Sequence, residues 1–198
     1  MILYSSPINL HSHRVRIVVA EKNIGVRIVQ VRDGNLPPDI QLLNPYNTLP
    51  TLVDRELAVY HSRIIINYLD ERFPQPPLMP VDPKRRAHFR LALHRIENDF
   101  YDLAARLDGN DGEGEKRQLR EAMIEVSEAV ESSRFFLGDE FSLVDCSLAP
   151  VLWRLRSYGI DPGPRAEALY GYMRRVFGRP SFMEGLSELE RDMRPLAA

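Results

Sequence analysis

The sequence predicts an α/β domain followed by an all-helical domain, and three observations support this prediction. Short β-prone runs alternate with helical periodicity up to about residue 73. Five prolines then fall within the eleven residues 73–83, which excludes regular helix or central strand. Beyond them, apolar residues recur at three- and four-residue steps, as on the buried face of a helix.

The N-terminal part reads as strand, helix, strand, short helix, hairpin and helix. The expected elements are a strand at 2–4, a helix beginning near Ser12 and ending at Gly25, a strand at 26–31 and a short helix at 39–43. A loop at 33–38 precedes that short helix. Asp54-Arg55-Glu56 is a polar connection of hairpin length between two β-prone runs. The order βαβαββα is that of a thioredoxin-like domain.

The stretch 44–68 contains the features of a peptide-binding site. Pro50 begins the first hairpin strand, and the Leu49–Pro50 bond is a candidate for the cis isomer. In that isomer the backbone of Leu49 turns outward and can pair with an extended peptide. Ser62 precedes an apolar-periodic segment and is the predicted N-cap of a helix, whose free N–H groups attract a carboxylate. The sequence therefore predicts a cradle for a small acidic peptide.

We expect three parts: a thioredoxin-like domain at 1–74, a stiff extended linker at 75–83 and a helical domain at 84–198. The expected helices of the last part are 84–107, 115–132, one opening at Ser142 and running through Trp153, 165–177 and 181–191. An acidic turn at 108–114 separates the first two. Ser142 and Asp145 have the spacing of a capping box.

Composition restricts the class of protein. The chain has 198 residues, 44% of them hydrophobic, and no apolar run long enough to span a membrane. Its start lacks the pattern of a signal peptide, and a single cysteine, Cys146, fits a reducing cytoplasm. No Cys/His cluster has metal-ligand spacing. A net charge of −2 gives no general attraction for nucleic acid, so we expect a cytoplasmic protein that binds neither metal, membrane nor specific DNA.

The hairpin region resembles the glutathione S-transferase superfamily. The matching residues are Asn44, Pro45, Leu49, Pro50, Leu52, Asp54 and Ser62, and the spacing of Ser142 and Asp145 extends the resemblance into the second domain. The resemblance implies a glutathione-like pocket at Asn9, Leu49, Pro50, His61 and Ser62. His61 stands where the superfamily carries glutamate, and an imidazole would not attract the ammonium group of glutathione.

Transferase activity requires a group that lowers the thiol pKa of glutathione from about 8.5. The superfamily uses a Tyr, Ser or Cys near the start of the first helix, and the resemblance puts Asn9 there. An amide is a weaker donor and cannot ionise, so the site is expected to be degenerate and the protein not an enzyme. If it is an enzyme, Ser5 or Ser6 would be catalytic; otherwise these serines satisfy a turn.

The resemblance is closer to one branch, the stringent starvation protein A family. The matching segments are Ser12–Lys22, Leu43–Leu57, Ser62–Ile65, Tyr68–Pro74, Pro76–Val81, His94–Glu97, Phe141–Cys146, Leu148–Leu155 and Glu190–Arg194. The resemblance implies a homodimer that binds bacterial RNA polymerase with its sigma factor in stress or stationary phase, without ordinary transferase activity. That family's partner-facing pocket is centred on Pro-His-Pro; here Gln75 lies between Pro74 and Pro76, flanked by Phe73 and Pro77.

The residues expected to face the partner have suitable chemistry. Prolines are ordered before binding, so little conformational entropy is lost, and Phe73 offers an apolar anchor. Lys84 and Arg85 begin a basic stretch that includes Arg86, Arg90 and Arg95, which is either a solvated helix face or a patch for an acidic protein surface. The expected function is therefore polymerase-associated transcription regulation with no required cofactor. The alternatives are an active glutathione-dependent transferase or peroxidase, and a glutathione-binding sensor.

Overall fold

The computed structural model describes residues 1–32, 36–108, 112–193 and 195–196. The predicted loop at 33–35 and residues 109–111 of the acidic turn lie outside them. The chain divides into two compact units. The first contains Met1–Pro77 and Pro180–Asp192, and the second contains Leu78–Arg179 and Met193–Ala198.

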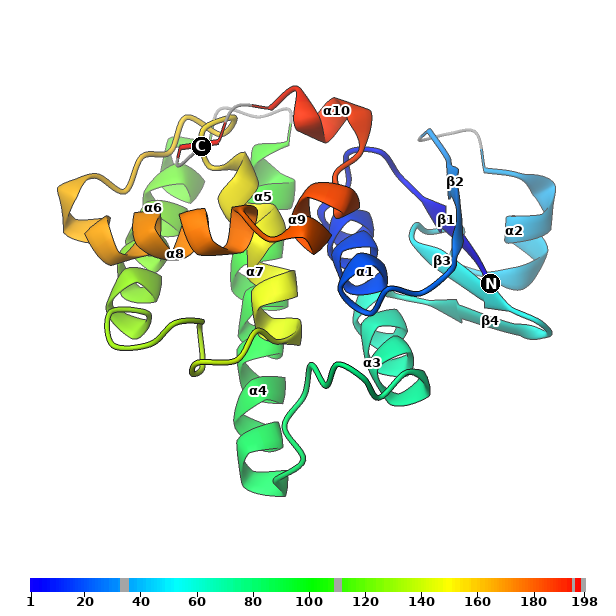
Figure 1. The fold of residues 1–198 in the computed structure, drawn as a ribbon. Helices are drawn as coiled ribbons and strands as arrows, with labels where there is room; N and C mark the ends of the chain where they lie inside the picture. Colours follow the sequence, from blue (N-terminus) through cyan, green and yellow to red (C-terminus); the bar gives the residue numbers. More distant parts are fainter. Residues whose placement is uncertain (33–35, 109–111, 194, 197–198) are drawn as a thin grey trace. The chain divides into compact units, whose positions relative to one another are not determined.

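The first unit has the predicted thioredoxin-like order of elements. They are β1 (Ile2–Ser5), α1 (Leu10–Glu21), β2 (Arg27–Gln30), α2 (Pro38–Leu43), β3 (Thr51–Asp54), β4 (Leu57–Tyr60) and α3 (Ser62–Arg72). The sheet order is β2-β1-β3-β4, with β1 and β2 parallel and the other two pairs antiparallel. Figure 1 shows α1 and α3 on one face of this sheet and α2 on the other. The predicted hairpin is confirmed, because Asp54 pairs with Leu57 across a two-residue turn.

The first helix begins earlier than predicted. Asn9 is the N-cap of α1, and its side-chain oxygen accepts hydrogen bonds from the backbone N–H groups of His11 (2.8 Å) and Ser12 (3.2 Å). The prediction that Ser12 begins the helix is therefore wrong. Ser12 is buried within the first turn, where its hydroxyl accepts from the N–H of Ser6 at 3.0 Å.

Two C-terminal helices, α9 (Pro180–Gly185) and α10 (Glu188–Arg191), belong to the first unit. We expected all of 84–198 to form one helical domain. Helix α9 packs on α1 of the first unit instead. The two helices approach so closely at Gly185 that a Cβ there would lie 3.0 Å from the backbone nitrogen of Ile17. Any side chain at position 185 would therefore require the two helices to move slightly apart.

The second unit is helical, as predicted. Its elements are α4 (Pro83–Arg95), the π-helical segment η1 (Ile96–Tyr101), α5 (Asp102–Leu107), α6 (Glu113–Ala129), α7 (Leu143–Arg154), the 3₁₀ segment η2 (Pro164–Ala166) and α8 (Glu167–Phe177). The predicted helix at 84–107 corresponds to α4, η1 and α5 in succession. Helix α7 is buried along its whole length, and its predicted capping box of Ser142 and Asp145 is confirmed. No helix among the described residues is long and apolar enough to cross a membrane.

The proline-rich segment is attached to the second unit through its middle. Leu78 and Met79 are buried, and the carbonyl of Leu78 accepts a hydrogen bond from the N–H of Leu143 at 3.0 Å. The predicted linker at 75–83 is therefore packed over part of its length. Both the Leu49–Pro50 and Gln75–Pro76 peptide bonds are cis.

Candidate functional site

The hairpin brings the predicted cradle residues together. Thr51 pairs with Tyr60, so Pro50 and His61 lie at the same end of the hairpin, and Ser62 follows as the first residue of α3. The loop before β3 is held by Asn44, which is fully buried. Its amide nitrogen donates to the Thr48 carbonyl at 3.0 Å and to the Thr51 hydroxyl at 2.9 Å. The hydrogen bonds of Asn44 thus fix the backbone that leads into the predicted cradle.

The hydroxyl of Ser62 is already engaged from within the protein. It accepts a hydrogen bond from the Arg14 guanidinium at 2.5 Å and lies 2.9 Å from Nδ1 of His11. Arg14 is fully buried, so this contact is part of the core of the first unit. The prediction that Ser62 is the N-cap of α3 is wrong. His61 occupies that position without a side-chain capping hydrogen bond, and Ser62 is inside the helix.

His61 is exposed and its backbone is strained. Its φ of 62° lies in the left-handed region, which residues other than glycine seldom adopt. Its ring lies 5.5 Å from the rings of both Tyr46 and Tyr60, centroid to centroid. These contacts orient an aromatic imidazole at the place where the superfamily has a carboxylate.

Ser5 and Ser6 lie in a buried polar network rather than at an accessible surface. Both are almost completely buried, and Nη1 of Arg16 donates to the Ser5 hydroxyl at 2.6 Å and to the Ser6 carbonyl at 2.8 Å. Arg16 also donates from Nε to the Gly185 carbonyl at 2.8 Å and forms an ion pair with Glu190. This geometry favours a structural role for the two serines over activation of a thiol.

The buried charges of α1 are important residues that the sequence reasoning missed. Arg14 and Arg16, within α1, and Lys22, directly after it, are all buried, and the helix also carries a continuous apolar stretch. One signal was available: residues two apart in a helix cannot share a face, so Arg14 and Arg16 cannot both point to solvent on the same side. The partner of Arg16, Glu190, is 174 residues away and leaves no local signal.

The segment Phe73–Pro77, which we call the proline corner, is accessible. Pro74, Gln75, Pro76 and Pro77 are exposed, and Phe73 is half-buried. The Arg72 guanidinium lies 5.4 Å from the centroid of the Phe73 ring. A surface hollow of about 370 Å³ adjoins the corner and is lined by residues 22–25 and 72–75.

Lys22 holds the proline corner from the inner side. Its ammonium group donates to the Asp70 carboxylate at 2.5 Å, to the Phe73 carbonyl at 2.7 Å and to the Pro76 carbonyl at 2.5 Å. The side chain of Lys22 has no exposed surface. This lysine, like Arg14 and Arg16, is part of the interior and is not available to a ligand.

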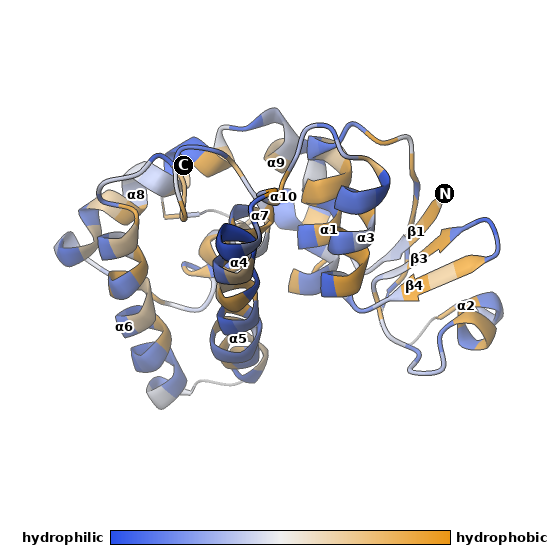
Figure 2. Ribbon diagram, turned by 90° about the horizontal axis from the view of Figure 1, so that it is seen from below, coloured by the Kyte–Doolittle hydropathy of each residue, from blue (hydrophilic) through white to orange (hydrophobic). Residues whose placement is uncertain are grey.

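The basic stretch lies on α4. This helix has no acidic residue, and four of its cationic side chains are exposed: Lys84, Arg85, Arg90 and Arg95. The fifth, Arg86, donates from Nε to the Pro80 carbonyl at 2.8 Å. Figure 2 shows α4 as predominantly hydrophilic. The exposed positive charge fits an acidic surface better than an apolar one.

Comparison with known proteins agrees with the fold. Residues 3–77 match the family described as the N-terminal domain of glutathione S-transferase, and residues 87–175 match its C-terminal domain. A delta-class glutathione transferase of Nilaparvata lugens shares the fold with a TM-score of 0.86 and 22% sequence identity, over 96% of this chain and 94% of the other. The two matched domains and the fold thus define a protein of the glutathione S-transferase superfamily.

Two relatives show to which branch of the superfamily the chain belongs. A stringent starvation protein A homolog of Coxiella burnetii is 44% identical over 98% of this chain and 95% of its own length. A stringent starvation protein A homolog of Pasteurella multocida is 46% identical over 94% of this chain and 90% of its own length. The chain belongs to the stringent starvation protein A family.

Proposed function

We propose that this protein regulates transcription in stress or stationary phase as a homodimer that docks on bacterial RNA polymerase holoenzyme with its sigma factor. The residues that contact the polymerase are those of the proline corner, together with Lys84 and Arg85. Membership of the stringent starvation protein A family and the exposure of Pro74–Pro77 support this proposal. The protein works in the cytoplasm and requires no cofactor.

The proline corner has the properties of a docking surface. Its prolines restrict the backbone before binding, so association costs little conformational entropy. Phe73 supplies an apolar side chain, and Gln75 offers an uncharged amide that can both donate and accept. The exposed cations of α4 would mainly raise the association rate with an acidic partner, in a manner that salt weakens.

The cradle supports a role without glutathione chemistry. Ser5 and Ser6 are buried and bonded to Arg16, and the side chain of Asn9 caps α1. The Ser62 hydroxyl already accepts from Arg14. Ser5, Ser6 and Ser62 therefore offer glutathione no accessible hydroxyl for its thiol, and His61 stands where the superfamily carries glutamate.

Substitution of the corner prolines tests the polymerase contact. We expect Pro74→Ala/Pro76→Ala to weaken capture of purified holoenzyme by about tenfold, since a more flexible corner must be ordered on binding. The matched control is Pro45→Ala, which changes an exposed proline outside the corner and should leave capture unchanged. Equal capture by all three proteins contradicts docking at the corner, and no capture by any of them contradicts the proposed function.

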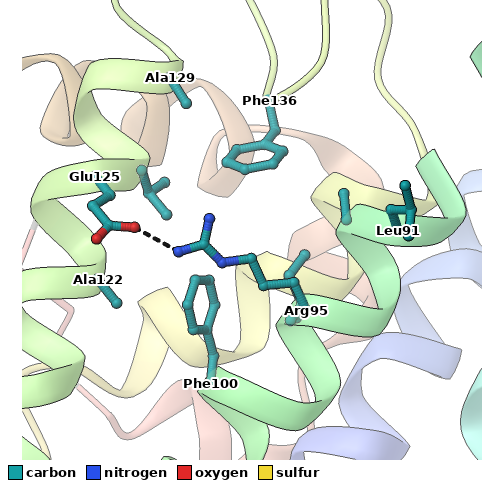
Figure 3. Close-up of a pocket in the computed structure, with 10 residues that line it drawn as sticks. Leu91, Arg95, Phe100, Ala122, Glu125, Ala129 and Phe136 are labelled. Carbon is teal, nitrogen blue, oxygen red and sulfur yellow. Dashed lines mark hydrogen bonds and ion pairs between the residues drawn. The ribbon is translucent and has the colours of Figure 1, made fainter. Parts of the chain in front are cut away.

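The homodimer is proposed to form across α4 and α6. These helices border an apolar pocket of about 240 Å³ that Figure 3 shows, and Leu91 stands beside it with 66% of its surface exposed. Arg95 and Glu125 also line this pocket and form an exposed ion pair, 2.5 Å apart. A projecting leucine and an apolar hollow on one face are self-complementary across a two-fold axis.

Leu91→Glu is expected to convert the dimer into a monomer. A carboxylate at this position would have to be desolvated in the apolar pocket, which outweighs the contact that leucine makes. Light scattering coupled to size-exclusion chromatography measures the mass. Leu189→Glu is the control, because Leu189 is 49% exposed on α10 and should leave the dimer intact. A Leu91→Glu protein with the mass of the wild type would exclude this interface.

A further inference from the structure

The proline corner has few backbone N–H groups with which to hold its bend by hydrogen bonds of its own. Pro74, Pro76 and Pro77 have no backbone N–H, so Gln75 carries the only backbone donor of 74–77. The carbonyls of Phe73 and Pro76 nevertheless point at the same atom, Nζ of Lys22, at 2.7 and 2.5 Å. Two carbonyls three residues apart would lie about 10 Å from each other in an extended chain. The segment is therefore bent around the ammonium group.

All three donors of the ammonium group have acceptors. The third hydrogen bond, to the Asp70 carboxylate at 2.5 Å, supplies the counter-charge that a buried cation needs. Asp70 lies in the last turns of α3 and Lys22 directly follows α1. The side chain of Lys22 thus connects the proline corner to both α1 and α3, which belong to the same unit.

We infer that Lys22 is the positioning residue of the docking surface: it holds the carbonyls of Phe73 and Pro76 so that the proline corner keeps the shape its partner recognises. This inference rests on the proposed function for the identity of the partner. The geometry of the three hydrogen bonds is independent of that identity. Lys22 itself does not touch the partner, because its side chain is fully buried.

A purely structural role for Lys22 makes a different prediction. Lys22→Met removes the ammonium group that pairs with the partly buried carboxylate of Asp70, so it lowers stability whether Lys22 positions the corner or only neutralises Asp70. Lys22→Met/Asp70→Asn removes both charges. Stability should then recover, but the two carbonyls remain without a donor. If Lys22 serves only to neutralise Asp70, binding recovers with stability; if it positions the corner, binding does not recover.

The experiment measures the affinity of each variant for immobilised RNA polymerase holoenzyme and its urea denaturation midpoint. We expect both Lys22 variants to bind about tenfold more weakly than the wild type, while the double variant regains most of the lost stability. Lys116→Met is the control, because Lys116 lies in the other unit and forms an ion pair with Glu113 of the same helix, α6, at 3.1 Å. Its affinity should not change.

Wild-type affinity in the double variant would overturn the inference. If the wild type itself fails to bind, the proposed function is wrong, and the amide resonance of Gln75 then decides the positioning role separately. This resonance should be single and sharp in the wild type and broadened or multiple in Lys22→Met/Asp70→Asn. An unchanged Gln75 resonance in the double variant would exclude a positioning role for Lys22.

Discussion

Glu190→Gln is expected to lower the free energy of unfolding by about 3–5 kcal/mol, because it leaves a buried guanidinium without its counter-charge. Arg16 is 3% exposed and Glu190 is fully buried, and the two form an ion pair. Glu190 also accepts from the N–H of Ser187 at 2.9 Å in the capping box of α10. The substitution therefore weakens the attachment of the C-terminal helices as well. Urea denaturation followed by circular dichroism measures the effect.

An exposed ion pair provides the matched control. Glu125→Gln makes the same chemical change opposite Arg95, but both side chains are about 60% exposed, so the cost should stay below about 1 kcal/mol. The double substitution Arg16→Met/Glu190→Gln removes both buried charges and should recover part of the loss. If the Glu190→Gln protein is as stable as the Glu125→Gln protein, then burial does not increase the contribution of the Arg16–Glu190 ion pair to stability.

The fold was predictable because its signals are local. The hairpin was marked by polar residues between two β-prone runs, and the buried helix α7 by the spacing of Ser142 and Asp145. The periodicity of the apolar residues located α4, η1 and α5, whose predicted core positions are buried: Phe89, Leu93, Ile96, Phe100, Leu103 and Leu107. Each of these patterns lies within a few turns of chain.

The polar interior was not predictable because its contacts are distant in sequence. Arg16 meets Glu190 across most of the chain, and Lys22 meets Asp70 and Phe73 about fifty residues away. The same contacts explain why α9 and α10 belong to the first unit. The prediction that Ser62 is an N-cap failed for the same reason, because its hydroxyl accepts a hydrogen bond from Arg14 of a different helix.

These buried cations link the proposed absence of glutathione chemistry to the proposed docking surface. In α1, Arg14 occupies the Ser62 hydroxyl and Arg16 occupies Ser5, which are groups that a glutathione enzyme would need free. Lys22, at the end of the same helix, holds the proline corner. Residues of α1, and Lys22 directly after it, thus occupy hydroxyl groups of the predicted pocket and support the proposed docking surface. If the proposed function holds, variants of α1 should change partner binding and stability.

Asp145→Ala is expected to cost about 3–4 kcal/mol of stability, because it leaves several buried donors without an acceptor. Its carboxylate accepts from the N–H groups of Phe136 and Ser142, both at 2.9 Å, from the Ser142 hydroxyl at 2.8 Å and from the Tyr172 hydroxyl at 2.7 Å. The residue is fully buried. Asp139→Ala is the control: Asp139 is exposed and accepts from the Arg134 N–H at 3.2 Å, so its loss should cost below about 1 kcal/mol.

The pH dependence of that cost tests the balance between burial and hydrogen bonding at Asp145. Burial raises the pKa of this carboxyl group, and the hydrogen bonds to its oxygens oppose the rise. Because the pKa of Asp145 is higher in the folded chain than in the unfolded chain, the folded chain binds more protons at this residue. The contribution of Asp145 to stability therefore falls as the pH rises from the unfolded-state pKa to the folded-state pKa. Asp145→Ala should therefore cost more near about pH 5 than near about pH 8. A cost that grows with pH instead would mean that the four donors outweigh burial and hold the group ionised.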